Sequence, residues 1–460
     1  MTGKISSRRR VAGLVLVAAL AACSGPVAPT GQMPDKTVAK VPLPALKRFG
    51  PARPAPPQRS NADMAQDFVD LSFRLETGRP LLAFSRFDGP LTLALTGAVP
   101  ASAPADLAEL LARLRSEAGL PITLASPGAQ AAITIEFLPR RKLQARARDA
   151  ACFAAPRVSS WAEYRRAGAA QLDWTDYTQR TEAAIFIPSD TGPQETRDCL
   201  NEELAQVLGP LNDLFRLPDS VFNDDNIHGV LTGFDMLMLR ATYAPDLQPG
   251  MSESAVAAVI PGILARLNPG GERPGSFAPP TPRAFRDAIA RALGPGNAPQ
   301  GRRAAAETAL ALSQGWQDGR TGFAWLTLGR VIGRTEPALA RNAFTNAAAI
   351  YHANGLPLHA AHAELQLAMR ALSVGDWPGA IALCDAATGP AQAGQNAALL
   401  AGLLMVKAEA LERMGQADAA RPVRLDSLGW ARYGMASDAE VRRRLALIDA
   451  LADEAGKPIP

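Results

Sequence analysis

The C-terminal third of the chain repeats itself, and this repetition restricts most strongly how the chain can fold. Residues from 301 onward are rich in Ala and carry apolar residues at helical spacing. The stretch Gly375-Asp376-Trp377 is followed by small residues at Ala380, Cys384 and Ala387. Similar small and aromatic residues stand forty positions away on either side: Ala340, Phe344, Ala347, Gly415 and Ala420. Such units are expected to be stacked helical pairs, because one pair alone cannot bury its apolar face.

This pattern resembles the tetratricopeptide repeat. The stretch Trp325-x-x-Leu328-Gly329 matches the signature of the first helix of a preceding repeat. The forty-residue spacing is longer than the usual repeat of about 34 residues, so a variant repeat is indicated. A nonrepetitive helical bundle is the alternative. The resemblance implies a protein-binding scaffold, and we expect an all-α tetratricopeptide-like array over residues 301–460.

The preceding region, residues 63–268, alternates between helix and strand patterns and predicts an α+β domain. Helices are expected from about Asp63 to Leu75 and over Asp106–Ala118, Leu200–Leu208 and Gly233–Thr242. Short strands are expected at Ala83–Phe87, Leu91–Leu95, Ile122–Leu124, Ile133–Phe137 and Ala184–Ile187. The first two strands flank a turn at Asp88-Gly89. Residues 269–300, which begin with a Pro-rich and Gly-rich stretch, are expected to be a linker.

The first 22 residues have the composition of an export signal. Lys4 and the three arginines 8–10 precede an apolar run, 11–22, that is too short for a bilayer span of about 20 apolar residues. The sequence Leu20-Ala21-Ala22-Cys23 resembles the bacterial lipobox, which implies that Cys23 is lipidated and becomes the new N-terminus. An ordinary signal peptide with an incidental Cys is the alternative.

Lipidation at Cys23 predicts a location in the cell envelope, anchored on the periplasmic side. Ser24 rather than Asp follows the Cys, which favours the outer over the inner membrane. Residues 23–62 include nine prolines and are expected to form a disordered or polyproline-like tether. Without residues 1–22, 44 basic residues balance 44 acidic ones, so no nucleic-acid partner is expected. The expected partners are the membrane, through the lipid, and a protein, through the repeats.

A helix followed by a turn carries the clearest chemical signal. Glu202 and Gln206 share one helix face, Gly209 can end the helix at a positive φ, and Asn212 follows the turn. This spacing resembles the metzincin zinc site, in which two ligands four residues apart precede a turning glycine and a third ligand. Glu202, Gln206 and Asn212 stand at the ligand positions, and Glu203 stands at the general-base position.

The residues downstream extend the resemblance. Asp213 completes the turn, and Pro218–Phe222 resembles the turn beneath such sites, with Phe222 in the place of the usual Met. The stretch Leu231-Thr232-x-x-Asp235 resembles the capped helix that follows. Residues 63 to about 255 resemble the uncharacterised bacterial domain of unknown function 2927. The resemblance is carried by the sequences of Cys199–Asp225 and Arg240–Tyr243. That family has no established activity to transfer.

The residue types at this motif do not suit zinc. Gln and Asn amides are poor zinc ligands compared with His, Cys or carboxylate, so we expect no metal and no cofactor. A harder cation could use oxygen ligands from Glu202, Glu203, Asp213, Asp224 and Asp225. The sequence favours the simpler interpretation, in which these carboxylates cap helices and face solvent. Adjacent helix residues point about 100° apart, which disfavours Glu202 and Glu203 as an acid–base pair.

The remaining candidates are few. Cys152 and Cys199 lie in the α+β domain and are predicted to form a disulfide in an oxidising periplasm, leaving Cys384 reduced. His359 and His362 are expected at the surface of a repeat helix. The sequence as a whole predicts an exported lipoprotein with a pseudo-metallopeptidase domain and a non-catalytic binding or scaffold function. The alternative is an atypical hydrolase of peptide or cell-wall material that uses Glu203 as its base.

Overall fold

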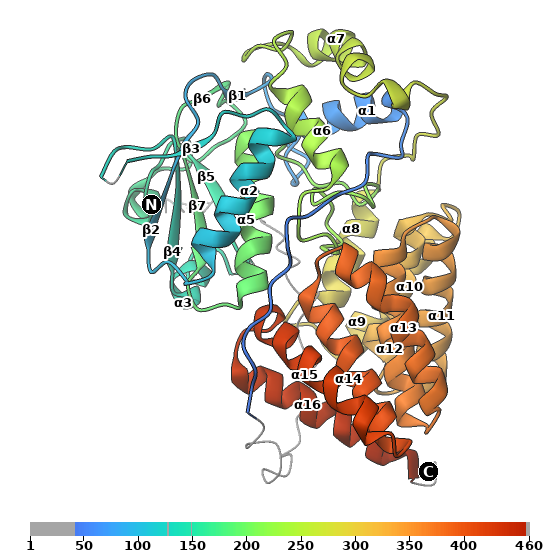
Figure 1. The fold of residues 1–460 in the computed structure, drawn as a ribbon. Helices are drawn as coiled ribbons and strands as arrows, with labels where there is room; N and C mark the ends of the chain where they lie inside the picture. Colours follow the sequence, from blue (N-terminus) through green and yellow to red (C-terminus); the bar gives the residue numbers. More distant parts are fainter. Residues whose placement is uncertain (1–41, 127, 149, 457–460) are drawn as a thin grey trace, which may run out of the picture.

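An α/β part and an all-helical part lie against each other in the computed structural model of the chain (Figure 1). The structure describes residues 42–126, 128–148 and 150–456. The predicted succession of a mixed sheet-and-helix domain and a helical array is confirmed. The predicted signal peptide, the lipidation site Cys23 and the first part of the tether lie outside the described residues. Among the described helices, none has the length and hydropathy that crossing a membrane requires.

The main sheet of the described chain has five strands. They are β2 (Thr92–Gly97), β3 (Thr123–Leu124), β4 (Ile133–Leu138), β5 (Phe153–Pro156) and β7 (Ala183–Pro188). Their order is β3-β2-β4-β7-β5, and of these strands only β5, at one edge, runs antiparallel to its neighbour.

A second, two-stranded parallel sheet pairs β1 (Arg86–Phe87) with β6 (Gln179–Arg180). The turn at Asp88-Gly89 therefore does not join two paired strands, and the expectation that it would is wrong. β1 finds its partner far along the chain, which a local turn signal cannot indicate.

The two faces of the main sheet belong to different cores, as the alternation of side chains along a strand requires. The covering helices are α2 (Ala103–Ser116), α3 (Arg140–Gln144), α4 (Trp161–Arg166) and α5 (Pro193–Leu208). Ile185 and Ile187 of β7 pack in the larger core with α2 and α5. Ala184 and Phe186 of the same strand pack in a smaller core with α3 and α4. The helix that carries the zinc-site-like motif therefore lies on one face, and α3 and α4 lie on the other.

Three further helices complete the α/β part at the upper end of Figure 1. They are α1 (Asn61–Ser72), α6 (Gly233–Thr242) and α7 (Glu253–Leu267). Each begins at a side-chain cap: Ser60 for α1, Thr232 for α6 and Ser252 for α7. The α6 cap is a full capping box with Asp235, as the sequence predicts.

In the helical part, each helix packs antiparallel against the next one along the chain. The helices are α8 (Arg283–Leu293), α9 (Pro299–Ser313), α10 (Gly319–Ile332), α11 (Pro337–Ala353), α12 (Pro357–Ser373), α13 (Trp377–Ala393), α14 (Ala397–Arg413), α15 (Ala417–Gly434) and α16 (Asp438–Asp453). Helix α8 lies inside the predicted linker, so the array begins earlier than residue 301. Phe285, Ala288, Ile289 and Ala292 are buried at helical spacing in the core of the array.

The forty-residue period is visible in the helix boundaries. Five successive helices begin at residues 337, 357, 377, 397 and 417. The turns between them place Gly355, Gly375, Gln395 and Gly415 at positive φ, with values of 66°, 81°, 51° and 74°. Glycine adopts this conformation at low cost, which explains three of the four positions.

Residues 42–60 of the predicted tether run extended along both parts of the molecule (Figure 1). On the helical side, Phe49 stacks on Trp430 with ring centroids 4.3 Å apart. On the α/β side, the Ala52 N–H donates to Glu109 Oε1 over 3.2 Å. This segment therefore holds the two parts together as well as leading toward the N-terminus.

Candidate functional site

The zinc-site-like motif lies at the C-terminal end of α5. The helix ends at Gly209, whose φ of −164° is extended, so the predicted positive φ is wrong. The glycine has a different role. A Cβ atom at this position would lie only 3.1 Å from side-chain atoms of Thr242 on α6. Glycine therefore allows α5 and α6 to approach each other closely.

Two buried arginines fix the ends of these helices. Arg180 donates from Nη1 to the carbonyls of Gln206 and Val207, at 2.9 and 2.6 Å, and from Nη2 to that of Gly209 at 2.7 Å. Arg86 donates to the carbonyl of Thr242 at 2.8 Å. Each arginine thus caps carbonyls that a helix C-terminus leaves unpaired. Neither arginine carries a local sequence signal for this role, because β1 and β6 bring them together from distant parts of the chain.

A buried turn supports the motif from below. The Ser220 hydroxyl donates to Asp235 Oδ1 at 2.5 Å, and the Val221 N–H donates to Asp235 Oδ2 at 3.2 Å. Phe222 is fully buried, and its carbonyl accepts from the Leu214 N–H at 2.9 Å. Burial raises the pKa of Asp235 to about 6. The turn that the sequence predicted beneath the motif is therefore buried and held in place by hydrogen bonds.

The three ligand-like positions do not converge. Gln206 donates from Nε2 to Asp213 Oδ2 at 3.4 Å. Asn212 instead donates from Nδ2 to the Asp70 carbonyl of α1 at 2.9 Å. Glu202 interacts electrostatically with other acidic groups. The structure thus keeps Glu202 and Gln206 near Asp213 and directs the Asn212 amide toward α1.

Glu203, at the general-base position, is held against the sheet edge. Its side chain is 5% exposed and accepts a hydrogen bond from the backbone of Ala154 in β5. Burial and the neighbouring Glu202 raise its pKa well above the usual range. One turn earlier, Cys199 is disulfide-bonded to Cys152, just before β5, with Cα atoms 6.1 Å apart.

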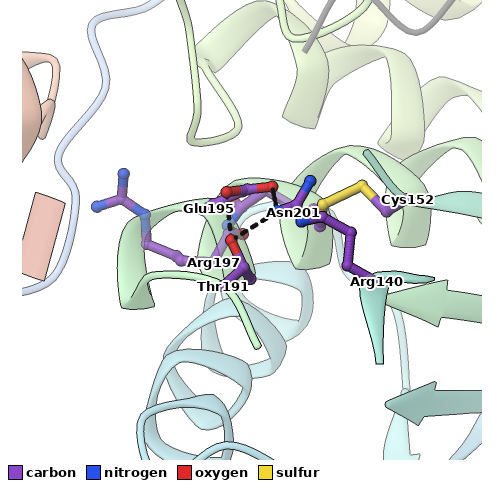
Figure 2. Close-up of a disulfide and its surroundings, with 7 residues drawn as sticks. Arg140, Cys152, Thr191, Glu195, Arg197 and Asn201 are labelled. Atoms are coloured by element: carbon purple, nitrogen blue, oxygen red, sulfur yellow. Dashed lines mark hydrogen bonds and ion pairs between the residues drawn. A yellow bond between two sulfur atoms is a disulfide. The ribbon is translucent and has the colours of Figure 1, made fainter. Parts of the chain in front are cut away.

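The disulfide confirms the predicted pairing, and Cys384 is free and buried as expected. Figure 2 shows the bond beside a polar group in which Arg140 bridges Thr191 and Glu195. The disulfide and the Glu203 contact both join α5 to β5. This face of the motif helix is therefore occupied by structural contacts.

Beside the motif lies a carboxyl cluster, defined here as Glu76, Glu202, Asp213 and Asp224. The Glu76 carboxyl is hydrogen-bonded to the side chains of Gln206 and Asp213. Two carboxyl groups in hydrogen-bond contact share a proton, since two carboxylates have no donor between them. Glu76, in the loop after α1, carries no local sequence signal and was not predicted.

Burial is the main cause of the altered acidity of the carboxyl cluster. It raises the pKa of Glu202 to about 8 and that of Asp224 to about 8, and the charge of Glu76 raises both further. The pKa of Asp213 is raised well above its usual range for the same reasons. Arg286 of α8 partly offsets the effect at Glu76 and Asp224. Near neutral pH the cluster therefore retains protons that isolated carboxyls would lose.

This acidity predicts that the protein loses stability as the pH rises from 5 to 8. The folded state binds more protons than the unfolded state in this window, so the free energy of unfolding falls with pH. Each unit of pKa difference corresponds to about 1.4 kcal/mol, and solvent screens these partly exposed groups, so Glu202→Gln should recover about 2 kcal/mol at pH 8. Urea unfolding at both pH values measures this. The exposed Glu454→Gln variant is the control, and a flat profile for the unmodified protein would contradict the prediction.

The donor set does not fit catalytic zinc. Such a site needs three His, Cys or carboxylate ligands and one open position. Gln206 and Asn212 supply amides that are engaged in other hydrogen bonds. In the part of the chain that the structure describes, no three His, Cys, Asp or Glu side chains are arranged to hold a metal ion. No reaction step through zinc follows from this arrangement.

Three of the four histidines meet where the two parts touch. His359 Nε2 lies 3.1 Å from Asp225 Oδ2, and its ring centroid is 5.6 Å from that of His228. His359 and His362 are only 1% and 9% exposed, so the expectation that they lie at the surface is wrong. Burial lowers the pKa of His228 to about 4, which keeps this ring neutral. The α/β part covers this face of α12, and a single helix pattern cannot reveal such a neighbour.

Comparison with known proteins agrees with the predicted resemblance for the α/β part. Residues 61–262 match a family described as a protein of unknown function, DUF2927. The match begins with α1 and ends within α7, so it includes the motif, the disulfide and the whole carboxyl cluster but not the helical array. None of the curated proteins matches the chain.

Proposed function

We propose that this protein is an exported envelope lipoprotein that binds a protein or an envelope polymer without catalysing a reaction. The main support is the environment of Glu203, which is buried and hydrogen-bonded to the β5 backbone. A general base must reach a reactant or an activated water. The side chains at the ligand-like positions offer no zinc site that would activate one. In this proposal the metzincin-like motif is the degenerate remnant of a metallopeptidase site.

The helical array is the proposed binding scaffold. Helix pairs that recur every forty residues build an extended surface, which is how tetratricopeptide-like arrays bind partners. The contacts of residues 42–60 with both parts would hold this scaffold in a defined orientation near its anchor. The proposed location is the periplasmic side of the envelope, preferably at the outer membrane.

The Glu203→Gln variant tests the non-catalytic proposal. Gln has nearly the same shape and can still accept a hydrogen bond from Ala154, so the fold and the capture of partners from crosslinked envelopes should be unchanged. Elemental analysis of the purified protein should give far less than one zinc per chain. One tightly bound zinc, together with a peptidase activity that Glu203→Gln abolishes, would replace this proposal with the hydrolase.

One observation favours the hydrolase as a second candidate. Glu202 and Asp224 are partly exposed, and burial raises the pKa of each to about 8, which suits a general acid at neutral pH. Hydrolysis of peptide or cell-wall material that both Glu202→Gln and Asp224→Asn abolish would support it. Activity that survives both changes would exclude these carboxyls as its catalytic groups.

Lipidation at Cys23 is predicted to control membrane attachment. Several acyl chains on one residue exceed the weak affinity of a single chain, so the unmodified protein should partition into detergent. The Cys23→Ser variant should lose its acyl label and move to the aqueous phase. Phase separation with a radiolabelled fatty acid measures both. Unchanged partitioning of the variant would contradict the lipobox interpretation.

A further inference from the structure

One face of the α/β part carries a dense group of exposed basic side chains on α3, α4 and the residues after α3. This basic face is defined by Arg141, Lys142, Arg146, Arg148, Arg165 and Arg166, all of which are exposed. None of the six forms an ion pair with another described residue. Since the rest of the predicted mature chain must then be net acidic, the positive charge here is a local feature.

The basic face rests on a rigid support. Leu143 of α3 and Trp161 of α4 are buried in the smaller core, together with Phe153 and Phe186 of the sheet. Trp161 and Phe186 pack edge to face with ring centroids 5.2 Å apart. Both helices are therefore fixed to the sheet, on the face opposite α5 and the motif.

Two acidic side chains near the basic face accept hydrogen bonds from neighbouring groups. Glu163 Oε2 accepts from the Ser159 N–H at 2.8 Å and from its hydroxyl at 2.9 Å. Glu136 Oε2 accepts from the Trp161 N–H at 2.6 Å. Arg140, the remaining base of α3, is paired with Glu195. Glu163 also interacts electrostatically with Arg166, but the carboxylates of Glu163 and Glu136 are outnumbered by the six basic side chains, so the basic face keeps a positive charge.

We propose that the basic face binds the phosphate head groups of an anionic membrane surface. Clustered Lys and Arg side chains attract anionic lipids, and guanidinium groups bind phosphate through two parallel hydrogen bonds. Two short helices on a sheet present these groups on an open surface rather than in a groove. A basic patch also adds to a lipid anchor in holding a protein at a membrane.

The position of the predicted anchor allows this contact. The stretch from Cys23 to Pro42 can span roughly 60 Å when extended, which is enough for the α/β part to turn its basic face toward the bilayer. The proposal rests on the proposed export to the envelope. It concerns different residues from the lipid anchor, so the two can be tested separately.

Vesicle binding by the mature chain with Cys23→Ser tests the proposal, because no acyl chain then contributes. The protein should sediment with vesicles of phosphatidylglycerol and phosphatidylcholine, but not with phosphatidylcholine alone. Binding should fall when NaCl rises from about 50 to about 500 mM. The variant R141Q/K142Q/R146Q/R148Q should bind at least about tenfold more weakly. Its circular dichroism should be unchanged, since these side chains are exposed.

The matched control removes four exposed arginines of the helical array, R334Q/R341Q/R421Q/R443Q. It carries the same change in net charge and should bind as the unmodified chain does. Equal losses in both variants would overturn the proposal, because net charge alone would then explain binding. Binding to a soluble polyanion such as dextran sulfate, without binding to anionic vesicles, would also overturn it. If the protein does not bind anionic vesicles but its detergent partitioning still depends on Cys23, the lipid-anchor proposal stands and only the basic-face proposal is overturned.

Discussion

Replacing Arg180 with Met should lower the free energy of unfolding by about 4 kcal/mol. The Arg180 guanidinium donates to the carbonyls of Gln206, Val207 and Gly209, and Arg180 is 2% exposed. Met keeps most of the apolar volume but leaves three carbonyls without a donor, and each orphaned buried group costs about 1–3 kcal/mol. Urea unfolding measures the loss. Hydrogen exchange should show the last turn of α5 opening first.

The control for this variant is Arg240→Ala on α6, where the side chain is exposed. A surface change of this kind should alter the free energy of unfolding by less than about 0.5 kcal/mol. A loss below about 1 kcal/mol for Arg180→Met would mean that water or backbone shifts satisfy the carbonyls, and that Arg180 is not the residue that positions the end of the motif helix.

Removing the disulfide should have an effect of similar size. Cys152 and Cys199 are 47 residues apart, and closing such a loop stabilises a protein by about 4 kcal/mol in the chain-entropy model. The double variant Cys152→Ala/Cys199→Ala should therefore unfold at markedly lower urea concentration. Its loss should match that of the unmodified protein under a reducing agent.

Thiol counting gives an independent check of the disulfide. Denatured mature protein that carries Cys23→Ser should show one free thiol, from Cys384, and three after reduction. The single variant Cys384→Ala is the control, because it removes a buried thiol without opening a loop. Three free thiols before reduction would contradict the predicted bond.

Local patterns in the sequence were enough to predict several elements. Helix α6 has the predicted bounds, Gly233–Thr242, because its capping box and apolar spacing both act within a few residues. The forty-residue period appears directly in the helix starts and in the positive φ of Gly375 and Gly415. The cysteine pairing followed from the small number of cysteines in the α/β part.

The carboxyl cluster shows which contacts local sequence patterns cannot predict. Glu202, Asp213 and Asp224 were candidates, but Glu76 joins them from a loop more than a hundred residues away. Asn212 has the expected spacing, yet its amide bonds to the α1 backbone instead of turning toward Gln206. Spacing along a helix and a turn indicates which residues can meet, while their hydrogen-bond partners are set by packing.

Periodicity, caps and glycine positions act over a few residues, and these features alone specified several of the helices, most of the strands, the repeat and the place of the motif. Burial and pairing depend on which surfaces meet, and only the tertiary structure decided those. It placed Arg180 beneath α5 and His359 against Asp225. It also left Arg141 and its basic neighbours facing outward. The same residue type is therefore a buried helix cap at one position and an exposed charge at another.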